Sequence, residues 1–182
     1  MRPLVCVGFV VIVALGMASS GHGQAQMPNP EIMLGYPAPD FTLETVDGQP
    51  VTLSKLKGKI VVLDFWATWC RPCRLYMPDL IAVTDQYKDK DVVLYTVNRD
   101  DPKANIQRFM ELTKMNAAVL LDKEGTVNND FFVSSIPHTV FIGKDGTVQS
   151  VHVGAEKKSA LKKELETLVS GQNLVEPKQP VK

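Results

Sequence analysis

The sequence predicts an α/β fold in which a mixed central sheet is flanked by helices. Apolar runs typical of buried strands alternate with helical patterns, Asp-Gly turns mark two hairpins, and an amphipathic stretch ends the pattern. A strand–helix alternation followed by an antiparallel hairpin and a closing helix gives a mixed sheet covered on both faces. The 182 residues correspond to about one domain.

The first half of the pattern begins with a hairpin around Asp47-Gly48, inside "PDFTLETVDGQPVTL". The run "KIVVLDFWA" (59–67) is apolar throughout most of its length, which predicts a strand buried on both faces. Helical spacing then extends from Cys70 to about Lys88. The side chains expected to face inward are Leu75, Leu80, Val83 and Tyr87.

The second half repeats this alternation. Asp101 and Pro102 resemble a helix start, with Asp101 as the N-cap and Pro102 at the first helical position. The helix they open should end near Met115. The other expected elements are strands 91–98 and 117–122, a brief helix after Gly125, a hairpin of 138–143 with 147–154, and a helix at 156–170 that buries Leu161, Leu165 and Leu168.

The chain begins with a segment unlike the rest. Arg2 is followed by an apolar run from Leu4 to Ala18 and then by small polar residues, an order typical of a secretory signal. An uncleaved anchor is the alternative, although the run is shorter than the roughly 20 residues of a spanning helix. Either segment places the folded part outside the cytoplasm, where disulfides persist. We expect a signal or anchor at 1–25, a linker at 26–34, the domain at 35–170 and a flexible tail at 171–182.

Charge excludes one class of partner. The chain has 20 basic and 20 acidic residues, so it lacks the basic surplus that nucleic-acid binding requires. No nucleic acid is expected as a partner, and contact with a membrane is expected only through the amino-terminal segment.

Beyond that segment the only cysteines are Cys70 and Cys73. Residues three apart on a helix have Cβ atoms roughly 5–6 Å apart, close to the span of a disulfide. Such a bond closes a very short loop and stabilises the fold little, which favours a chemical role for the two cysteines over a structural disulfide. Zinc commonly needs four ligands, and this part of the chain adds only His138 and His152. Haem attachment needs a histidine after the second cysteine, where Arg74 stands.

The remaining interpretation is a redox pair without metal or cofactor. Cys70 should stand at the amino end of a helix, where free N–H groups and the helix dipole stabilise a thiolate. Arg71 adds a positive charge, and Pro72 costs no hydrogen bond in the first turn. Cys73, one turn further along, is the natural resolving thiol for thiol–disulfide exchange.

These residues resemble a known family. "FWATWCRPC" resembles the thioredoxin motif W-C-x-P-C, and "SSIPHTVFIGKDG" resembles the thioredoxin cis-proline loop and its following hairpin. "APDFTL" and the extra strand–helix segment between 100 and 133 resemble the TlpA/ResA-like branch of the AhpC/TSA-redoxin superfamily. That branch contains exported thiol:disulfide oxidoreductases, several of which serve cytochrome c maturation. The resemblance implies a thioredoxin fold with an amino-terminal β-hairpin and a strand–helix insertion.

The resemblance also implies residue roles. Cys70 would attack, Cys73 would resolve, and the two would form a disulfide. Ile136-Pro137 would be a cis peptide packed against the cysteines, with the Ile136 backbone open to a substrate strand. Trp66 and Trp69 would frame the site, although an aromatic at a strand end is as often core. The residues expected to contact substrate are Trp69, Arg71, Pro72, Ile136, Pro137 and His138.

Two positions depart from the family pattern. Tyr76 stands where the family often has an acid, which weakens an assignment to apocytochrome c. His138 replaces the usual threonine after the cis-proline. Two interpretations of His138 stay open: it lies near Cys70 and tunes the thiolate, or it is an exposed histidine.

Asp64 interrupts the apolar run "VVLDFWA". An unpaired carboxylate inside a strand costs several kcal/mol through desolvation. Either Asp64 lies at the strand end and reaches water or a backbone donor, or it lies beneath the cysteines as the matching thioredoxin acid does. In the second case burial raises its pKa, and the carboxyl can take the proton of Cys73 during resolution.

The expected function is therefore that of an extracytoplasmic, monomeric disulfide reductase, with protein disulfides as substrates and a membrane or thioredoxin-type electron donor. "APDF" also resembles peroxiredoxins, but the stretch before Cys70 lacks the proline of their P-x-x-x-[ST]-x-x-C pattern. A redox chaperone or binding module without turnover is the third candidate. The direction of electron flow depends on a redox potential that the sequence does not reveal.

Overall fold

The computed structural model describes residues 29–179. The expected signal or anchor at 1–25 lies outside these residues. Over the described part of the chain, no helix combines the length and the apolar character needed to cross a membrane.

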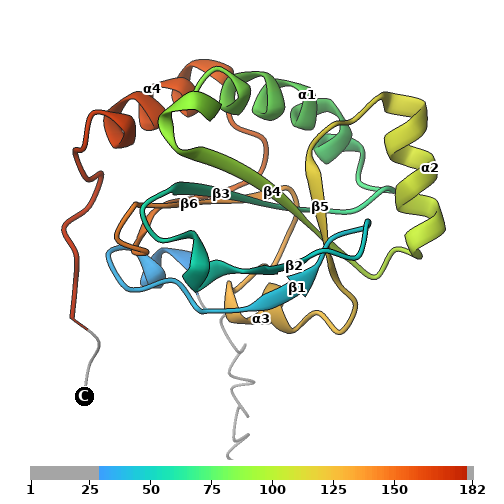
Figure 1. Cartoon of the computed structure of the whole chain (residues 1–182), viewed down its shortest axis with the longest axis horizontal. Coiled ribbons are helices and arrows are strands. Elements are labelled where there is room, and N and C mark those ends of the chain that lie inside the picture. Colours follow the sequence, from blue (N-terminus) through green and yellow to red (C-terminus); the bar gives the residue numbers. More distant parts are fainter. Residues whose placement is uncertain (1–28, 180–182) are drawn as a thin grey trace, which may run out of the picture.

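A five-stranded mixed sheet forms the centre of the molecule, with the strand order β5-β4-β3-β6-β7 (Figure 1). The strands are β3 (Ile60–Trp66), β4 (Val92–Arg99), β5 (Ala118–Asp122), β6 (His138–Ile142) and β7 (Val148–Val153). Strands β3, β4 and β5 are parallel, whereas β6 is antiparallel to both β3 and β7. This is the predicted α/β arrangement, in which a parallel part is continued by an antiparallel hairpin.

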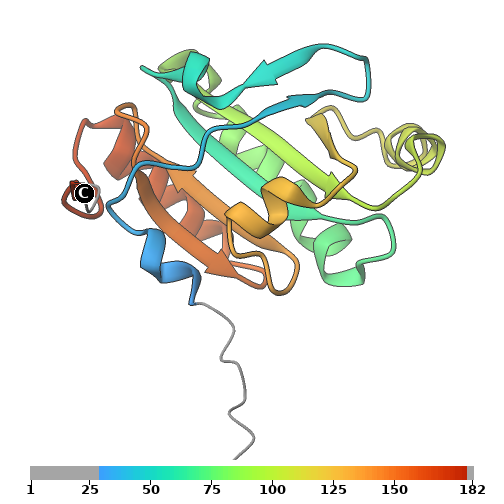
Figure 2. The same cartoon turned by 90° about the horizontal axis from the view of Figure 1, so that it is seen from below.

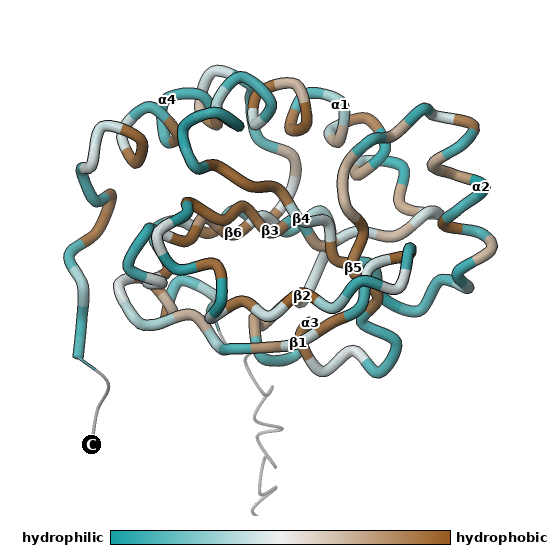
Figure 3. The backbone as a smooth tube through the Cα atoms, in the orientation of Figure 1, coloured by the Kyte–Doolittle hydropathy of each residue, from teal (hydrophilic) through white to brown (hydrophobic). Residues whose placement is uncertain are grey.

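Strand β3 lies in the middle of this sheet, and every one of its residues is buried. Its apolar sequence follows from that position, because helices cover one face and the amino-terminal hairpin covers the other. The central strands are accordingly mostly hydrophobic, while the outer helices alternate between hydrophobic and hydrophilic residues (Figure 3). Asp64 is the single charged residue within β3.

Two layers cover the sheet. Helices α1 (Arg71–Asp85) and α4 (Lys158–Val169) lie side by side on one face, and α2 (Lys103–Thr113) lies beside the β5 edge (Figure 1). The other face carries α3 (Thr126–Asp130) and the hairpin of β1 (Thr42–Glu44) and β2 (Pro50–Thr52) (Figure 2). Short 3-10 helices complete the fold: η1 (Pro30–Met33), η2 (Leu53–Leu56) and η3 (Lys88–Lys90).

The closing helix α4 buries Leu161, Leu165 and Leu168, as its amphipathic pattern predicted. The prediction for α1 needs correction at one position, because Leu75 is 72% exposed. Helix α1 instead buries a stripe at spacings of three and four residues, which puts Leu75 on the opposite side. The buried residues of α1 are Cys73, Tyr76, Met77, Leu80, Val83 and Thr84.

The start of α2 also differs from the prediction. The helix begins at Lys103, with Pro102 as its N-cap, and no side chain makes a capping hydrogen bond there. Asp101 does not cap α2, because its carboxylate binds residues near the end of β3 and of β4. These donors, which include a backbone N–H, bind the Asp101 carboxylate in place of the N–H groups in the first turn of α2.

The expected linker and tail are partly ordered against the domain. Within 26–34, helix η1 buries Met33, and Gly35 N then donates to Val148 O. Beyond α4, Leu174 N donates to Gln149 Oε1 and Lys178 N donates to Gly35 O. The chain from 172 to 178 therefore lies along the domain.

Candidate active site

The two cysteines lie where the chain passes from β3 to α1. Cys70 is the N-cap of α1, and Pro72 is in the first turn, as predicted. The loop before Cys70 is held by Asp101, whose carboxylate accepts hydrogen bonds from Thr68 N at 2.6 Å and Thr68 Oγ1 at 2.9 Å. Asn98 Nδ2 donates to the same carboxylate at 3.0 Å. These bonds fix the loop that presents Cys70.

Cys70 and Cys73 form a disulfide across the first turn of α1, with a Cα–Cα distance of 5.3 Å. The backbone N–H of Cys73 donates to Cys70 Sγ at 3.2 Å. Once the disulfide is reduced, the same N–H and the positive end of the helix dipole stabilise a thiolate on Cys70. Cys73 has no exposed surface, whereas Cys70 retains 4%. Of the two cysteines, only Cys70 therefore reaches the surface.

The peptide bond between Ile136 and Pro137 is cis, as the resemblance implied. It packs against the disulfide, because Cys70 Sγ lies 3.8 Å from the carbonyl oxygen of Ile136. Pro137 is buried and Ile136 is half-buried. The loop thus brings a backbone carbonyl and an apolar side chain to the edge of the cysteine site.

An open surface surrounds Cys70. Trp69 is 71% exposed, and Arg71 and Pro72 are also exposed. A pocket beside the disulfide extends from Trp69 to the loop of Ser134, Ser135 and Ile136. Trp66 also lines this pocket, but it is only 1% exposed and its ring packs against Phe109, with centroids 5.1 Å apart. Trp66 is therefore a core residue.

Asp64 is completely buried in the middle of β3. Its Oδ1 accepts a hydrogen bond from Thr139 Oγ1 at 2.9 Å, and its Oδ2 has no hydrogen-bond partner among the described residues. Burial raises the pKa of Asp64 to about 8, and the Thr139 hydrogen bond opposes that rise only in part. Asp64 is thus not at a strand end in contact with water, and it is mostly protonated at neutral pH.

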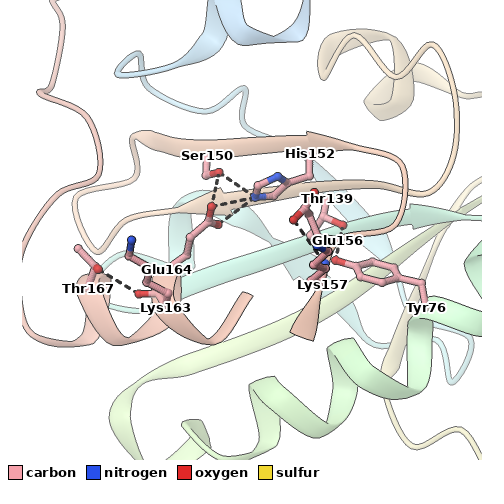
Figure 4. Close-up of polar contacts among 9 residues, drawn as sticks. All are labelled: Tyr76, Thr139, Ser150, His152, Glu156, Lys157, Lys163, Glu164 and Thr167. Atoms are coloured by element: carbon pink, nitrogen blue, oxygen red, sulfur yellow. Dashed lines mark hydrogen bonds and ion pairs between the residues drawn. The ribbon is translucent and has the colours of Figure 1, made fainter. Parts of the chain in front are cut away.

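The hydroxyl of Tyr76 lies 3.2 Å from Thr139 Oγ1 (Figure 4). The same Thr139 Oγ1 donates to Asp64 Oδ1. Tyr76 comes from α1 and Thr139 from β6, so Thr139 connects an element distant in sequence to Asp64 of β3. In the sequence Tyr76 stands out only as a departure from a family pattern, and no pattern marks Thr139. The pairing of Asp64 with Thr139 in adjacent strands could only be known from the sheet register.

His138 is buried and not exposed, so one of its two interpretations was wrong. Its ring packs edge-on against Phe65, with centroids 5.7 Å apart, and neither ring nitrogen has a partner among the described residues. Burial, with a smaller contribution from the charge of His152, lowers the pKa of His138 to about 4. The side chain is therefore neutral and offers no surface to a substrate.

His152 makes a separate polar cluster on β7. Its Nε2 lies 3.0 Å from both carboxylate oxygens of Glu164 on α4 and 3.0 Å from Ser150 Oγ (Figure 4). Burial lowers the pKa of His152, but the Glu164 hydrogen bond and the charges of Glu164 and Glu156 outweigh burial and raise it overall. The pair contributes stability below about pH 6.5, and that contribution is lost as pH rises through the higher folded-state pKa.

Replacing Glu164 by glutamine should therefore destabilise the protein in a pH-dependent way. We expect a loss on the order of 1 kcal/mol in the free energy of unfolding at pH 5.5, and a smaller loss at pH 9. Urea unfolding at both pH values measures it. Glu166→Gln, whose carboxylate is paired with the exposed Lys162, is the control and should show no such difference. An equal loss at both pH values would contradict a protonated His152.

The chain is similar to proteins of known family and structure. The model of the AhpC/TSA family matches residues 34–151. The chain belongs to the AhpC/TSA family. A thiol-disulfide oxidoreductase ResA from Geobacillus thermodenitrificans is 33% identical over 137 residues, which cover 75% of this chain and 79% of that relative.

Solved structures of similar proteins agree with this membership. A thiol:disulfide interchange protein of the thioredoxin family from Chlorobium tepidum has a TM-score of 0.67 and 26% identity, covering 74% of this chain and 97% of that one. A secreted disulfide oxidoreductase from Mycobacterium tuberculosis has a TM-score of 0.61 and 26% identity, covering 72% and 95%. The predicted thioredoxin fold is confirmed, and this AhpC/TSA member is a thiol:disulfide oxidoreductase.

Proposed function

We propose that this protein is an extracytoplasmic disulfide reductase that acts on protein substrates through Cys70 and Cys73. The observation that carries the proposal is the position of Cys70, at the amino end of α1 and 3.8 Å from the Ile136 carbonyl oxygen. An extended substrate segment that pairs with the Ile136 backbone would bring its disulfide to Cys70. The exposed Trp69 and the pocket beside it offer that segment an apolar surface.

The reaction has two exchange steps. In the first, the Cys70 thiolate attacks a substrate disulfide, so a Cys70–substrate disulfide forms and one substrate sulfur leaves as a thiolate. In the second, Asp64 accepts the proton of Cys73, and the Cys73 thiolate attacks Cys70 Sγ. The mixed disulfide breaks, the second substrate sulfur leaves, and Cys70–Cys73 is oxidised. Two electrons have passed from the enzyme dithiol to the substrate.

The oxidised pair must then be reduced by a dithiol donor, and a membrane or thioredoxin-type protein fits that chemistry. The amino-terminal segment 1–25, with its charge followed by an apolar run, supports an extracytoplasmic location. The secreted relative agrees with this location. Service in cytochrome c maturation is a narrower proposal that depends on the resemblance to the TlpA/ResA-like branch, and Tyr76 in place of an acid gives it less support.

An insulin-reduction assay with dithiothreitol tests the proposed activity. The protein should accelerate insulin precipitation, and Cys70→Ser should abolish the acceleration because the remaining thiol of the pair, that of Cys73, has no exposed surface from which to attack. A peroxide-consumption assay run in parallel should show no turnover. Peroxide consumption without insulin reduction would favour a peroxidase, and inactivity in both assays combined with substrate binding would favour a chaperone or binding module.

The redox potential decides the direction. A reductase has a potential well below that of a strong oxidant, so equilibration with glutathione buffers should give a value far more negative than about −120 mV. A value near about −120 mV would contradict the reductase assignment while leaving the exchange chemistry intact.

A further inference from the structure

A short chain of hydrogen bonds connects α1 to the buried acid of β3. Thr139 Oγ1 lies 3.2 Å from the Tyr76 hydroxyl (Figure 4), and it lies 2.9 Å from Asp64 Oδ1. Asp64 and Thr139 have no exposed surface, and Tyr76 is 4% exposed. Water therefore has little access to these three groups, and the hydrogen bonds they make are mainly those to one another.

The number of hydroxyl hydrogens determines which group donates in each of these two hydrogen bonds. A threonine hydroxyl and a tyrosine hydroxyl each carry one hydrogen, and an ionised carboxylate only accepts. When Asp64 is ionised, Thr139 must give its hydrogen to Oδ1. The Tyr76 hydroxyl can then bond to Thr139 only by donating to it. Each bond polarises the next one, so the Tyr76 bond strengthens Thr139 as a donor.

We propose that Thr139 and Tyr76 are positioning residues that hold Asp64 Oδ1 as an acceptor and leave Oδ2 as the atom that exchanges a proton. Oδ2 is the carboxylate oxygen without a hydrogen-bond partner among the described residues. This inference rests on the proposed role of Asp64 in resolution: the proton of the Cys73 thiol goes to Oδ2, and the electron pair of that S–H bond stays on sulfur.

The hydrogen bonds of Thr139 and Tyr76 are the main polar interactions near Asp64, because the other polar groups around it have partners of their own. Strand β4 presents Thr96 opposite Asp64, but the Thr96 hydroxyl donates to Ala118 O. His152 of β7 is bound to Glu164 of α4, and the charges of Glu164 and Glu156 act on Tyr76. Burial raises the pKa of Asp64, and the Thr139 bond is the one interaction that opposes the rise.

The test is a pH titration of the Asp64 carboxyl in the oxidised protein, monitored by carbon-13 NMR. The Asp64 resonance is assigned by its absence from the spectrum of Asp64→Asn. Thr139→Val keeps the shape of the side chain but removes the hydrogen bond, and should move the midpoint to higher pH by about one pH unit or more. Tyr76→Phe should move it in the same direction by less, because Thr139 still donates. Thr139→Ser, which keeps the hydroxyl, should restore the midpoint.

Two control variants remove matched hydroxyls elsewhere. Thr96→Val deletes a buried hydroxyl on the neighbouring strand, and Tyr87→Phe deletes one that donates to Glu166. Neither should move the Asp64 midpoint. An unchanged midpoint in both Thr139→Val and Tyr76→Phe, or an equal change in the controls, would overturn the inference. Insulin reduction by the parent protein tests the proposed function separately, since the titration requires no turnover.

Discussion

Replacing Cys73 by serine is expected to turn the enzyme into a trap for its substrates. Cys70 keeps its place at the amino end of α1 and can still attack a substrate disulfide. The serine hydroxyl cannot displace the substrate from Cys70, so the mixed disulfide persists. Turnover in the insulin assay should fall to background, and covalent complexes should appear on a non-reducing gel and disappear with reductant.

Cys70→Ser is the matched variant for this experiment. It should form few complexes, because the remaining thiol of Cys73 has no exposed surface. Double replacement should form none. If Cys70→Ser traps substrates while Cys73→Ser traps none, the roles of the two cysteines are reversed.

The parts of the fold that the sequence predicted well are those set by local pattern. Strand β3 could be predicted because a residue buried on both faces must be apolar at nearly every position. The hairpins could be predicted because an Asp-Gly pair suits the backbone of a tight turn, and Gly48 and Gly146 both have positive φ. Cys70 and Cys73 were identified for a similar reason, since their spacing already decides what they can reach.

What the sequence did not predict depends on contacts between distant segments. Asp101 carries the signature of a helix cap, yet it binds Thr68, 33 positions earlier in the chain. Thr139 looks like an ordinary strand residue until the register pairs it with Asp64. Leu75 is as apolar as any core residue, and only the packing of α1 decides that Tyr76 is buried in its place.

Asp64 is the residue whose replacement should change stability in the most informative way. Its folded-state pKa of about 8 is far above that of an exposed aspartate, about 3.9. Between these values the folded state holds a proton that the unfolded state has released, so this group makes stability fall as pH rises from about 4 to about 8. Asp64→Asn removes that dependence. The amide introduced by this replacement does not titrate, so any hydrogen bonds it loses cost the same at every pH.

We therefore expect the stability of Asp64→Asn relative to the parent to increase with pH across this window, by about a factor of ten in the folding equilibrium per pH unit. The measurement is urea unfolding of both oxidised proteins at several pH values, and the difference cancels the contribution of His152. If the difference in unfolding free energy between Asp64→Asn and the parent stays constant from pH 5 to pH 8, the pKa of Asp64 is not raised, whichever of the two proteins is the more stable.

The kinetic effect of Asp64→Asn should be confined to one step. Attack by Cys70 needs no proton from Asp64, so formation of the mixed disulfide should keep its rate. Resolution by Cys73 should slow on the order of 100-fold, the usual contribution of a positioned general base, and its rise with pH toward about 8 should disappear. Rapid-mixing experiments with a fluorescent disulfide peptide separate the two steps. If Asp64→Asn resolves the mixed disulfide as fast as the parent from pH 6 to pH 9, Asp64 has no catalytic part, and the carboxyl that Thr139 and Tyr76 hold in place is a structural group.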